Sequence, residues 1–212
     1  MLTTTTLGVL TTLFLTTQAA HGDIVTVEVA GTVTNVIRTD PNRFDLDGSV
    51  SAGSPYQMTF VINTDAIDAD PDPGRGTYFI VAASGQLGNY IWSKTQAPVF
   101  GIEIDNDRVG VVDEYELGSQ DFDFTENFLI DGTPTLLSNN AFEFVLAGIN
   151  LSDPSMVALD SDALVLPLLN DWGSTSFGMR FISDENAVGF LEIVFIHGTV
   201  DSITVPEPVG IT

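Results

Sequence analysis

The chain has 212 residues, of which 44% are apolar and 14 are Phe, which is enough for a packed core and excludes a disordered protein. Its 29 Asp and Glu against 6 Lys and Arg give a formal net charge of −23. Such a surface repels phosphate backbones and anionic lipid headgroups, so nucleic acid and peripheral membrane binding are not expected. Cysteine is absent, which excludes disulfides and thiolate metal sites.

The first 22 residues, MLTTTTLGVLTTLFLTTQAAHG, have the pattern of a secretory signal peptide, although no basic residue precedes the apolar run. That run, 7–15, is too short to span a membrane. Ala20 and Gly22 supply the small residues of a cleavage site before Asp23. The sequence therefore predicts an exported protein of the cell envelope or the extracellular space. The alternative is a buried N-terminal strand, which Thr-rich apolar sequence also suits.

From Asp23 onward, runs rich in β-branched and aromatic residues alternate with clusters of Gly, Pro, Asn and Asp. The first run, 24–37, alternates apolar and polar residues, and Gly31 is expected to mark a bulge or bend. This spacing predicts one all-β domain over 23–204, built as an antiparallel β-sandwich or jelly roll. Further strands are expected at 56–63, 76–83, 89–93, 99–105, 108–113, 141–151, 177–183 and 189–205.

Two local features lie between these strands. Asn106-Asp107 stands where a two-residue hairpin loop would join 99–105 to 108–113, since both residues tolerate positive φ. The one helix-like stretch predicts a single turn of helix near 155–159.

The first and last strands carry similar sequences, AGTVTNVI at 30–37 and HGTVDSIT at 197–204. The similarity is too short for an internal repeat. We expect these two strands to lie side by side and close the sheet, which would leave both chain termini at one end of the domain.

The densest acidic run is NTDAIDADPDPGRGTY at 63–78, where Asp68, Asp70 and Asp72 stand at alternate positions. The first three ligands of a helix–loop–helix calcium site have this spacing, but Pro73 replaces the required Gly and Phe79 the final Glu. One interpretation is a solvated loop whose Pro and Gly residues set the backbone. The other is a Ca²⁺ site, the one cofactor considered, with the ligands Asp65, Asp68, Asp70 and Asp72.

Catalytic motifs do not stand out. The mature chain would contain a single histidine, His197, inside the last strand, where a structural role is expected. Nucleophile-elbow, zinc-protease and phosphate-loop motifs are absent from the sequence. Glycoside hydrolysis needs only two carboxylates across a cleft, but the sequence nominates no pair. We therefore expect no catalytic residues and a protein that is not an enzyme.

The ending SITVPEPVGIT at 202–212 places Pro206, Glu207 and Pro208 directly after the last expected strand. Together with the leader and with AGTVTNV, NTDAIDADPDPGRGTY and GTVDSITVPEP in that order, this ending resembles the small PEP-CTERM proteins of bacterial exosortase systems. The resemblance covers most of 23–208. In that family an apolar membrane segment and an Arg-rich cluster follow the motif, whereas only 209–212 follow here, so we interpret the signal as incomplete.

This resemblance implies that a membrane-embedded, exosortase-type sorting protease recognises Pro206, Glu207 and Pro208, with membrane contact only during sorting. It implies a product that goes to the cell envelope or into an exopolysaccharide matrix. Our first hypothesis is therefore a non-enzymatic surface or matrix protein associated with exopolysaccharide. The alternatives are a carbohydrate-binding module, with or without calcium, and a glycoside-acting enzyme. A sugar-stacking platform would use aromatic residues that are more often part of a core: Trp92, Trp172, Tyr56, Tyr78, Tyr90 and Tyr115.

Overall fold

The computed structural model describes residues 23–39, 46, 48–94, 99–108, 112–118, 129–130, 133–134, 144–185 and 189–206. No helix within these ranges is long and apolar enough to cross a membrane. The elements are β1 (Ile24–Arg38), β2 (Pro55–Asn63), β3 (Arg75–Ile80), β4 (Ala82–Leu87), β5 (Tyr90–Lys94), β6 (Val99–Arg108), β7 (Val112–Leu117), β8 (Leu129–Ile130), β9 (Thr133–Pro134), β10 (Phe144–Asp153), the 3₁₀ helix η3 (Leu169–Asp171), β11 (Ser174–Glu185) and β12 (Gly189–Thr204).

These strands form one antiparallel sheet in the order β3-β6-β7-β10-β11-β12-β1-β2-β4-β5-β8-β9. The prediction of an all-β, antiparallel fold is confirmed. The prediction of a sandwich or jelly roll is wrong, because a sandwich has two separate sheets. Here β12 pairs with both β11 and β1, so unbroken ladders connect the two halves.

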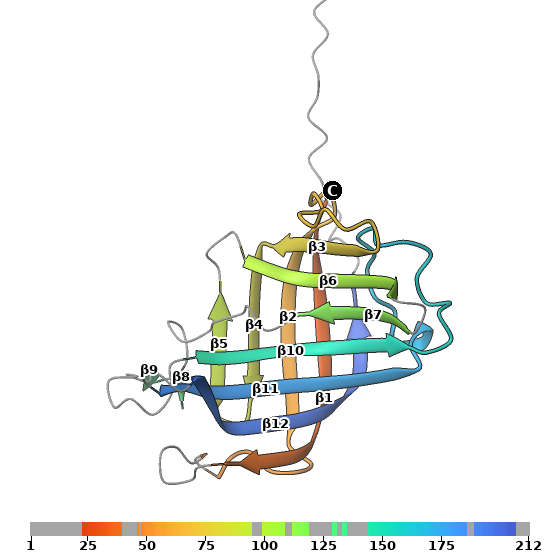
Figure 1. Cartoon of the computed structure of the whole chain (residues 1–212). Helices are drawn as coiled ribbons and strands as arrows, with labels where there is room; N and C mark the ends of the chain where they lie inside the picture. Colours follow the sequence, from red (N-terminus) through yellow and green to blue (C-terminus); the bar gives the residue numbers. More distant parts are fainter. Residues whose placement is uncertain are drawn as a thin grey trace, which may run out of the picture.

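The single sheet curls strongly around one core as a half-barrel. In Figure 1, β3, β6, β7, β10 and β11 cross the front of the molecule, while β2, β4 and β5 run steeply behind them. The long strands β1 and β12 turn the corner between the two directions. Their ladder shifts register between Ala30 and Gly31 and again between Val33 and Asn35. Because bulges bend a strand and increase its twist, these shifts permit the curl, and the bend expected at Gly31 is confirmed.

Side-by-side pairing of the first and last strands is also confirmed. The β1–β12 ladder runs from Glu28, opposite Thr204, to Arg38, opposite Val194. Antiparallel pairing therefore brings the start of β1 and the end of β12 to the same end of the sheet. The pair does not close the sheet as expected, because it lies in the middle of the strand order.

The core fills the space inside the curl and takes alternate residues of each strand. Tyr56 of β2 stacks on Phe177 of β11 with ring centroids 3.9 Å apart, which joins the back of the sheet to the front. The interpretation of the aromatic residues as core is confirmed, so they cannot form an exposed sugar platform. The six are all buried: Trp92, Trp172, Tyr56, Tyr78, Tyr90 and Tyr115.

The connection between β10 and β11, residues 154–173, is tied to the sheet by buried tyrosines. The hydroxyl of Tyr78 donates to the carbonyl of Asp162 at 2.9 Å, and that of Tyr115 to the carbonyl of Val165 at 3.0 Å. Near 155–159 the backbone makes turns and bends, so the helical turn expected there is wrong. The helix η3 lies ten residues further on, at Leu169–Asp171.

Candidate functional site

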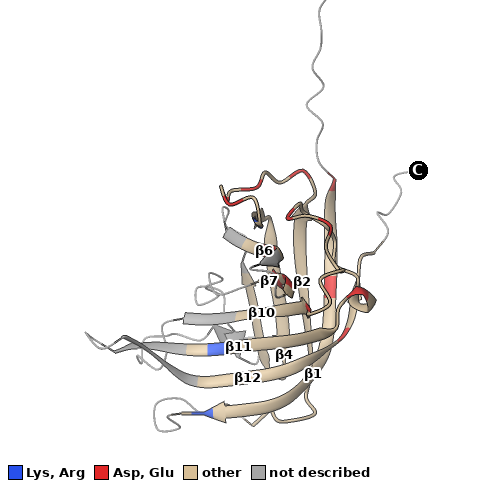
Figure 2. Cartoon of the chain, turned by 45° about the vertical axis from the view of Figure 1, so that its right-hand side comes forward, with Lys and Arg blue, Asp and Glu red and all other residues tan. Residues whose placement is uncertain are grey.

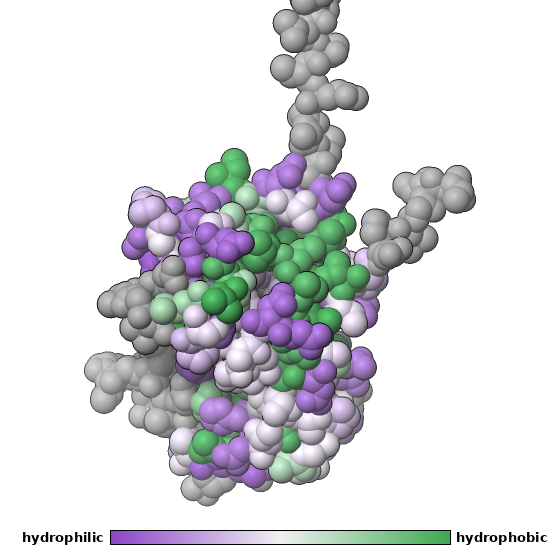
Figure 3. Space-filling model, turned by 90° about the vertical axis from the view of Figure 1, so that its right-hand side faces the viewer, coloured by the Kyte–Doolittle hydropathy of each residue, from purple (hydrophilic) through white to green (hydrophobic). Residues whose placement is uncertain are grey.

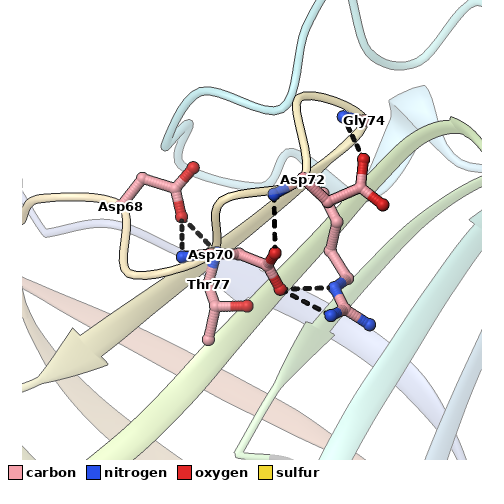
Figure 4. Close-up of polar contacts among 6 residues, drawn as sticks. Asp68, Asp70, Asp72, Gly74 and Thr77 are labelled. Atoms are coloured by element: carbon pink, nitrogen blue, oxygen red, sulfur yellow. Dashed lines mark hydrogen bonds and ion pairs between the residues drawn. The ribbon is translucent and has the colours of Figure 1, made fainter.

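The acidic loop, residues 64–74 between β2 and β3, is built from successive aspartate turns (Figure 4). Asp68 Oδ1 accepts from the Asp70 amide at 2.9 Å, and Asp70 Oδ1 accepts from the Asp72 amide at 2.8 Å. Asp72 Oδ1 accepts from the Gly74 amide at 3.0 Å. Each carboxylate thus closes a turn onto the amide two residues ahead, which is a structural use of alternate aspartates.

The first residue of β3, Arg75, supplies a counter-charge to this loop. Asp70 Oδ2 accepts a hydrogen bond from Nε of Arg75 at 2.6 Å. The same oxygen forms an ion pair with a terminal nitrogen of this guanidinium, also at 2.6 Å. The Asp72 amide, followed by the Arg75 guanidinium, holds the pKa of the Asp70 carboxyl below its usual value against the effect of burial. Asp70 is therefore engaged on both oxygens by groups of the protein itself.

The loop also covers the free edge of β3, which is the first strand of the sheet. The Ala69 amide donates to the Thr77 carbonyl at 2.9 Å, and the Thr77 amide donates to Asp68 Oδ1 at 2.8 Å. An edge strand with unpaired amides can pair with another chain, and a covering loop prevents this. The acidic run therefore has a structural function at this edge.

The four proposed calcium ligands do not form one cluster. Asp68, Asp70 and Asp72 are engaged with backbone amides as described, and Asp65 is exposed near the end of β2. Within the part of the chain that the structure describes, no group of three or more His, Asp or Glu side chains is placed to hold a metal ion. The Ca²⁺ hypothesis stays a prediction, and a titration described below tests it.

Three aspartates are buried at the ends of the front strands: Asp105, Asp113 and Asp153. Asp113 Oδ2 accepts from the Leu159 amide at 3.0 Å. Asp153 accepts from the hydroxyl and amide of Ser155 and from the Val157 amide. The Ser155 hydroxyl is the largest of the contacts that hold the pKa of Asp153 below its usual value. Asp113 and Asp153 therefore anchor the 154–173 connection.

A depression of about 290 Å³ lies on the outer face of β7, β10, β11 and β12, the front strands of Figure 1. The outer face is identified by alternation: Ala147, Ile149 and Phe177 point to the core, so Asn150 and Ser176 point away from it. Side chains from all four strands line the depression: Glu116, Asn150, Ser176, Arg180, Phe195 and His197.

Glycines form the floor of this depression. Gly148 of β10 and Gly178 of β11 are direct register partners, so neighbouring strands lack an outward side chain at the same point. The backbone of Gly118, which has φ +78°, lies directly against the outer side of Gly148. A Cβ on Gly148 would lie 2.2 Å from the Gly118 carbonyl oxygen. The floor therefore exposes backbone between the side chains of its rim.

The two sides of the depression differ in chemistry. On the β12 side, the Arg180 guanidinium lies 4.9 Å from the Phe195 ring centroid, and the rings of Phe195 and His197 are 3.9 Å apart. On the β7 side, Asn150 Nδ2 donates to carboxylate oxygens of both Glu114 and Glu116. Burial, and then the neighbouring Glu114 charge, raise the pKa of Glu116, while Asn150 opposes the shift.

His197 was expected to be structural, and the structure places it on the rim of this depression, half-buried beside Phe195. The other rim residues were not predicted. One signal was present in the sequence: AGIN in β10 and FGMR in β11 both place Gly between core residues, which leaves the outer face bare.

The charge of the described residues is unevenly placed. Figure 2 shows Asp and Glu gathered at the end of the sheet where β1 begins and where the loops lie. Arg180 lies on β11 and lines the depression, which therefore combines a local cation with an otherwise acidic molecule.

A second surface feature is apolar. Figure 3 shows hydrophobic side chains gathered on the face that carries the 154–173 connection, where Val157 and Leu168 are 77% and 60% exposed. A depression of about 240 Å³ beside them is lined mainly by apolar residues of the same connection. The outer-face depression is the better candidate for a specific ligand, because it combines polar groups of several kinds with an aromatic ring.

Comparisons with models of known protein families, with curated proteins and with solved structures find no match to this chain. What the protein does must therefore be inferred from its own residues and their geometry. The expected signal peptide, residues 1–22, and two residues of the expected sorting motif, Glu207 and Pro208, lie outside the described residues, whereas Pro206 is described and exposed.

Proposed function

We propose that the protein is an exported, non-enzymatic protein of a PEP-CTERM-type sorting system, associated with exopolysaccharide in the cell envelope or outside the cell. The observation that carries this proposal is the position of the two targeting motifs relative to the sheet. The β1–β2 ladder begins at Ile24, opposite Asn63, so cleavage before Asp23 removes no residue of a described strand. At the other end β12 finishes at Thr204, and Pro206 is exposed.

The chemistry of the motif supports recognition by a protease. Proline has no amide donor and fixes φ, so Pro206 and Pro208 cannot extend the β12 ladder. Prolines also favour an extended backbone, which is the form that peptide-binding clefts commonly accept. Because β12 ends at Thr204 and Pro206 is exposed, we expect an exosortase-type enzyme to reach the motif from Pro206 onward.

The carboxylates of the outer-face depression favour binding over hydrolysis. Glu114 and Glu116 lie on the same strand and share one amide, that of Asn150. A glycosidase instead needs its two carboxylates on opposite sides of the scissile bond. Among the described residues of this depression, the side opposite Glu116 carries Arg180, Phe195 and His197.

Export is tested by producing residues 1–212 in a Gram-negative host and measuring the mass of the protein in each cell fraction. We expect the periplasmic protein to begin at Asp23, because the apolar run and the small residues before Asp23 form a cleavage signal. A matched Leu10→Arg variant interrupts the apolar run and should stay uncleaved in the cytoplasm. Uncleaved wild-type protein in the cytoplasm would exclude export by this leader.

A second arm of the same experiment tests the sorting motif. An apolar segment of about 20 residues and an Arg cluster are added after Thr212, and the chain is produced in a host that has an exosortase. We expect processing of the wild-type motif and retention of the unprocessed form in the Glu207→Ala variant. Equal processing of both chains would exclude a role of Glu207 in recognition.

A further inference from the structure

We infer that the outer-face depression of β7, β10, β11 and β12 is a binding site for neutral sugar units of a polysaccharide. The inference rests on the proposed association with exopolysaccharide and assigns that association to named residues. It begins from the glycine floor. The floor carries no side chain, because Gly178 has none and the backbone of Gly118 covers Gly148, so a flat ring can lie against this backbone. At Gly178 the nearest atom to a Cβ would be a Phe195 ring carbon at 3.5 Å, so the ring borders the floor closely.

The rim has the mixture of groups that hydroxyls require. A sugar hydroxyl donates one hydrogen bond and accepts others, so a site for it needs donors and acceptors together. Arg180 and His197 supply donors on one side, and the Glu116 carboxylate supplies acceptors on the other. On the same side as Arg180 and His197, Phe195 offers apolar surface for the C–H face of a sugar ring.

The negative charge of the molecule favours a neutral sugar over an anionic one as the ligand. The chain carries a formal −23, and the β7 side of the depression adds Glu116, which shares the Asn150 amide with the neighbouring Glu114. A uronate or a phosphate would have to approach this field and then lie near two carboxylates, which a single local guanidinium offsets only in part. A neutral ring avoids this repulsion and still uses both sides of the rim.

The size of the depression limits the ligand. Its volume of about 290 Å³ is at the lower end of ordinary small-ligand sites, which run from roughly 300 to 1,000 Å³. One or two sugar rings fit this space. The depression lies on an outer face of the sheet and not inside the core, so the rest of a polymer can continue into solvent.

Affinity electrophoresis tests the site, with native gels that contain dextran, a galactomannan or a mixed-linkage β-glucan as neutral probes and alginate as the anionic probe. We expect at least one neutral polysaccharide to retard the wild-type protein and alginate not to do so. Ser176 is exposed on β11, so Ser176→Leu fills the depression without changing the core. This variant should weaken apparent affinity about tenfold or more, because the side chain occupies ligand space.

A matched control is Gln86→Leu, which adds the same side chain at an exposed position of β4, in the other half of the sheet. It should bind as the wild type does, and both variants should unfold at the wild-type midpoint. Phe195→Leu should also weaken binding, because it removes the ring that borders the floor.

Each result distinguishes the inference from the proposed function. Equal retardation of wild type and Ser176→Leu would overturn the assignment of the site but leave polysaccharide association standing. Retardation by alginate alone would overturn the neutral-sugar assignment. No retardation by any neutral probe would overturn the inference, while the processing experiment on the leader would still decide export separately.

Discussion

Gly148 and Gly178 face each other on neighbouring strands, but their surroundings differ. A Cβ on Gly148 would meet backbone atoms of Gly118, 2.2 Å from the oxygen and 2.6 Å from the carbonyl carbon. Gly118 is itself held by a hydrogen bond of 2.7 Å from its amide to the Gly101 carbonyl. A Cβ on Gly178 would meet only a side-chain ring at an ordinary contact distance. One glycine is thus required by close backbone approach, and its partner is not.

Alanine at each position separates these two cases. We expect Gly148→Ala to lower the free energy of unfolding by about 1–3 kcal/mol, since backbone must move to admit the methyl group. Gly178→Ala should be neutral or stabilising by up to about 1 kcal/mol, because alanine restricts the unfolded chain more than glycine does. Urea unfolding of the two variants measures both values. Equal destabilisation would show that the close approach of Gly118 has no energetic consequence.

At the scale of elements, the acidic loop and β3 form one unit. The loop supplies hydrogen-bond partners to Thr77, the middle of an edge strand, and Arg75 at the start of that strand pairs with Asp70. The Asn106 amide of β6 adds a hydrogen bond of 3.1 Å to the Gly74 carbonyl. The aspartates therefore shape the loop so that it covers an edge, and their alternate spacing follows from turns that repeat every two residues.

Removal of single carboxylates tests whether the acidic loop stabilises the fold by covering β3. Asp68→Ala removes the acceptor for the Asp70 and Thr77 amides, so we expect it to lower the free energy of unfolding by roughly 1–2 kcal/mol. The matched variant Asp65→Ala removes an exposed carboxylate of the same loop and should change stability by less than about 0.5 kcal/mol. Chemical unfolding provides the comparison. A larger effect at Asp65 than at Asp68 would contradict the edge-covering role.

For the whole molecule, self-repulsion is the dominant electrostatic feature. A formal charge of −23 on one curled sheet opposes the compact state, and screening by salt relieves this opposition. The described acids gather at one end of the sheet, which concentrates the repulsion there (Figure 2). Cations in general should therefore stabilise the fold, whether or not the acidic loop binds one of them.

Thermal unfolding in Ca²⁺ and in Mg²⁺ at equal concentration separates screening from a specific site. We expect Tm to rise with both ions by the same amount, because the Asp68, Asp70 and Asp72 carboxylates are engaged with backbone amides. A specific site on the folded state would add a rise with calcium that grows with its concentration. That additional rise, lost in Asp70→Asn, would establish the calcium site expected from the spacing of the aspartates.

Strand positions could be predicted closely where alternation is regular. The expected runs at 24–37 and 56–63 correspond to β1 and β2 within one residue at each end. The expected hairpin at Asn106-Asp107 is wrong, since β6 continues through Arg108, which pairs with Val112. Both residues suit a turn, but the Asn106 amide is held by the Gly74 carbonyl, and Asp105 is buried. These partners are distant in sequence, so no local pattern contains them.

The expected strand at 76–83 is also altered by a contact between residues that are distant in sequence. It divides at Val81 into β3 and β4, which lie in different halves of the sheet. The Val81 amide donates to the Val61 carbonyl at 2.8 Å, so the bend is stabilised by a neighbouring strand. Of the residues in the candidate site, the sequence drew attention only to His197, and a structural role was expected for it. Arg180, Phe195 and Glu116 come together through the pairing of β7, β10, β11 and β12.

Short-range patterns are sufficient for the all-β class, for the inward-facing residues of regular strands and for the composition of the acidic loop, because these depend on residues within a few positions of each other. Whether the strands would form two sheets or one depended on the ladder between β1 and β12, whose residues are up to 176 positions apart, Glu28 to Thr204. Ladder hydrogen bonds join backbone groups that every residue except proline has, so side-chain identity specifies such pairing only weakly. The curl, the covered edge and the outer-face depression all follow from that pairing.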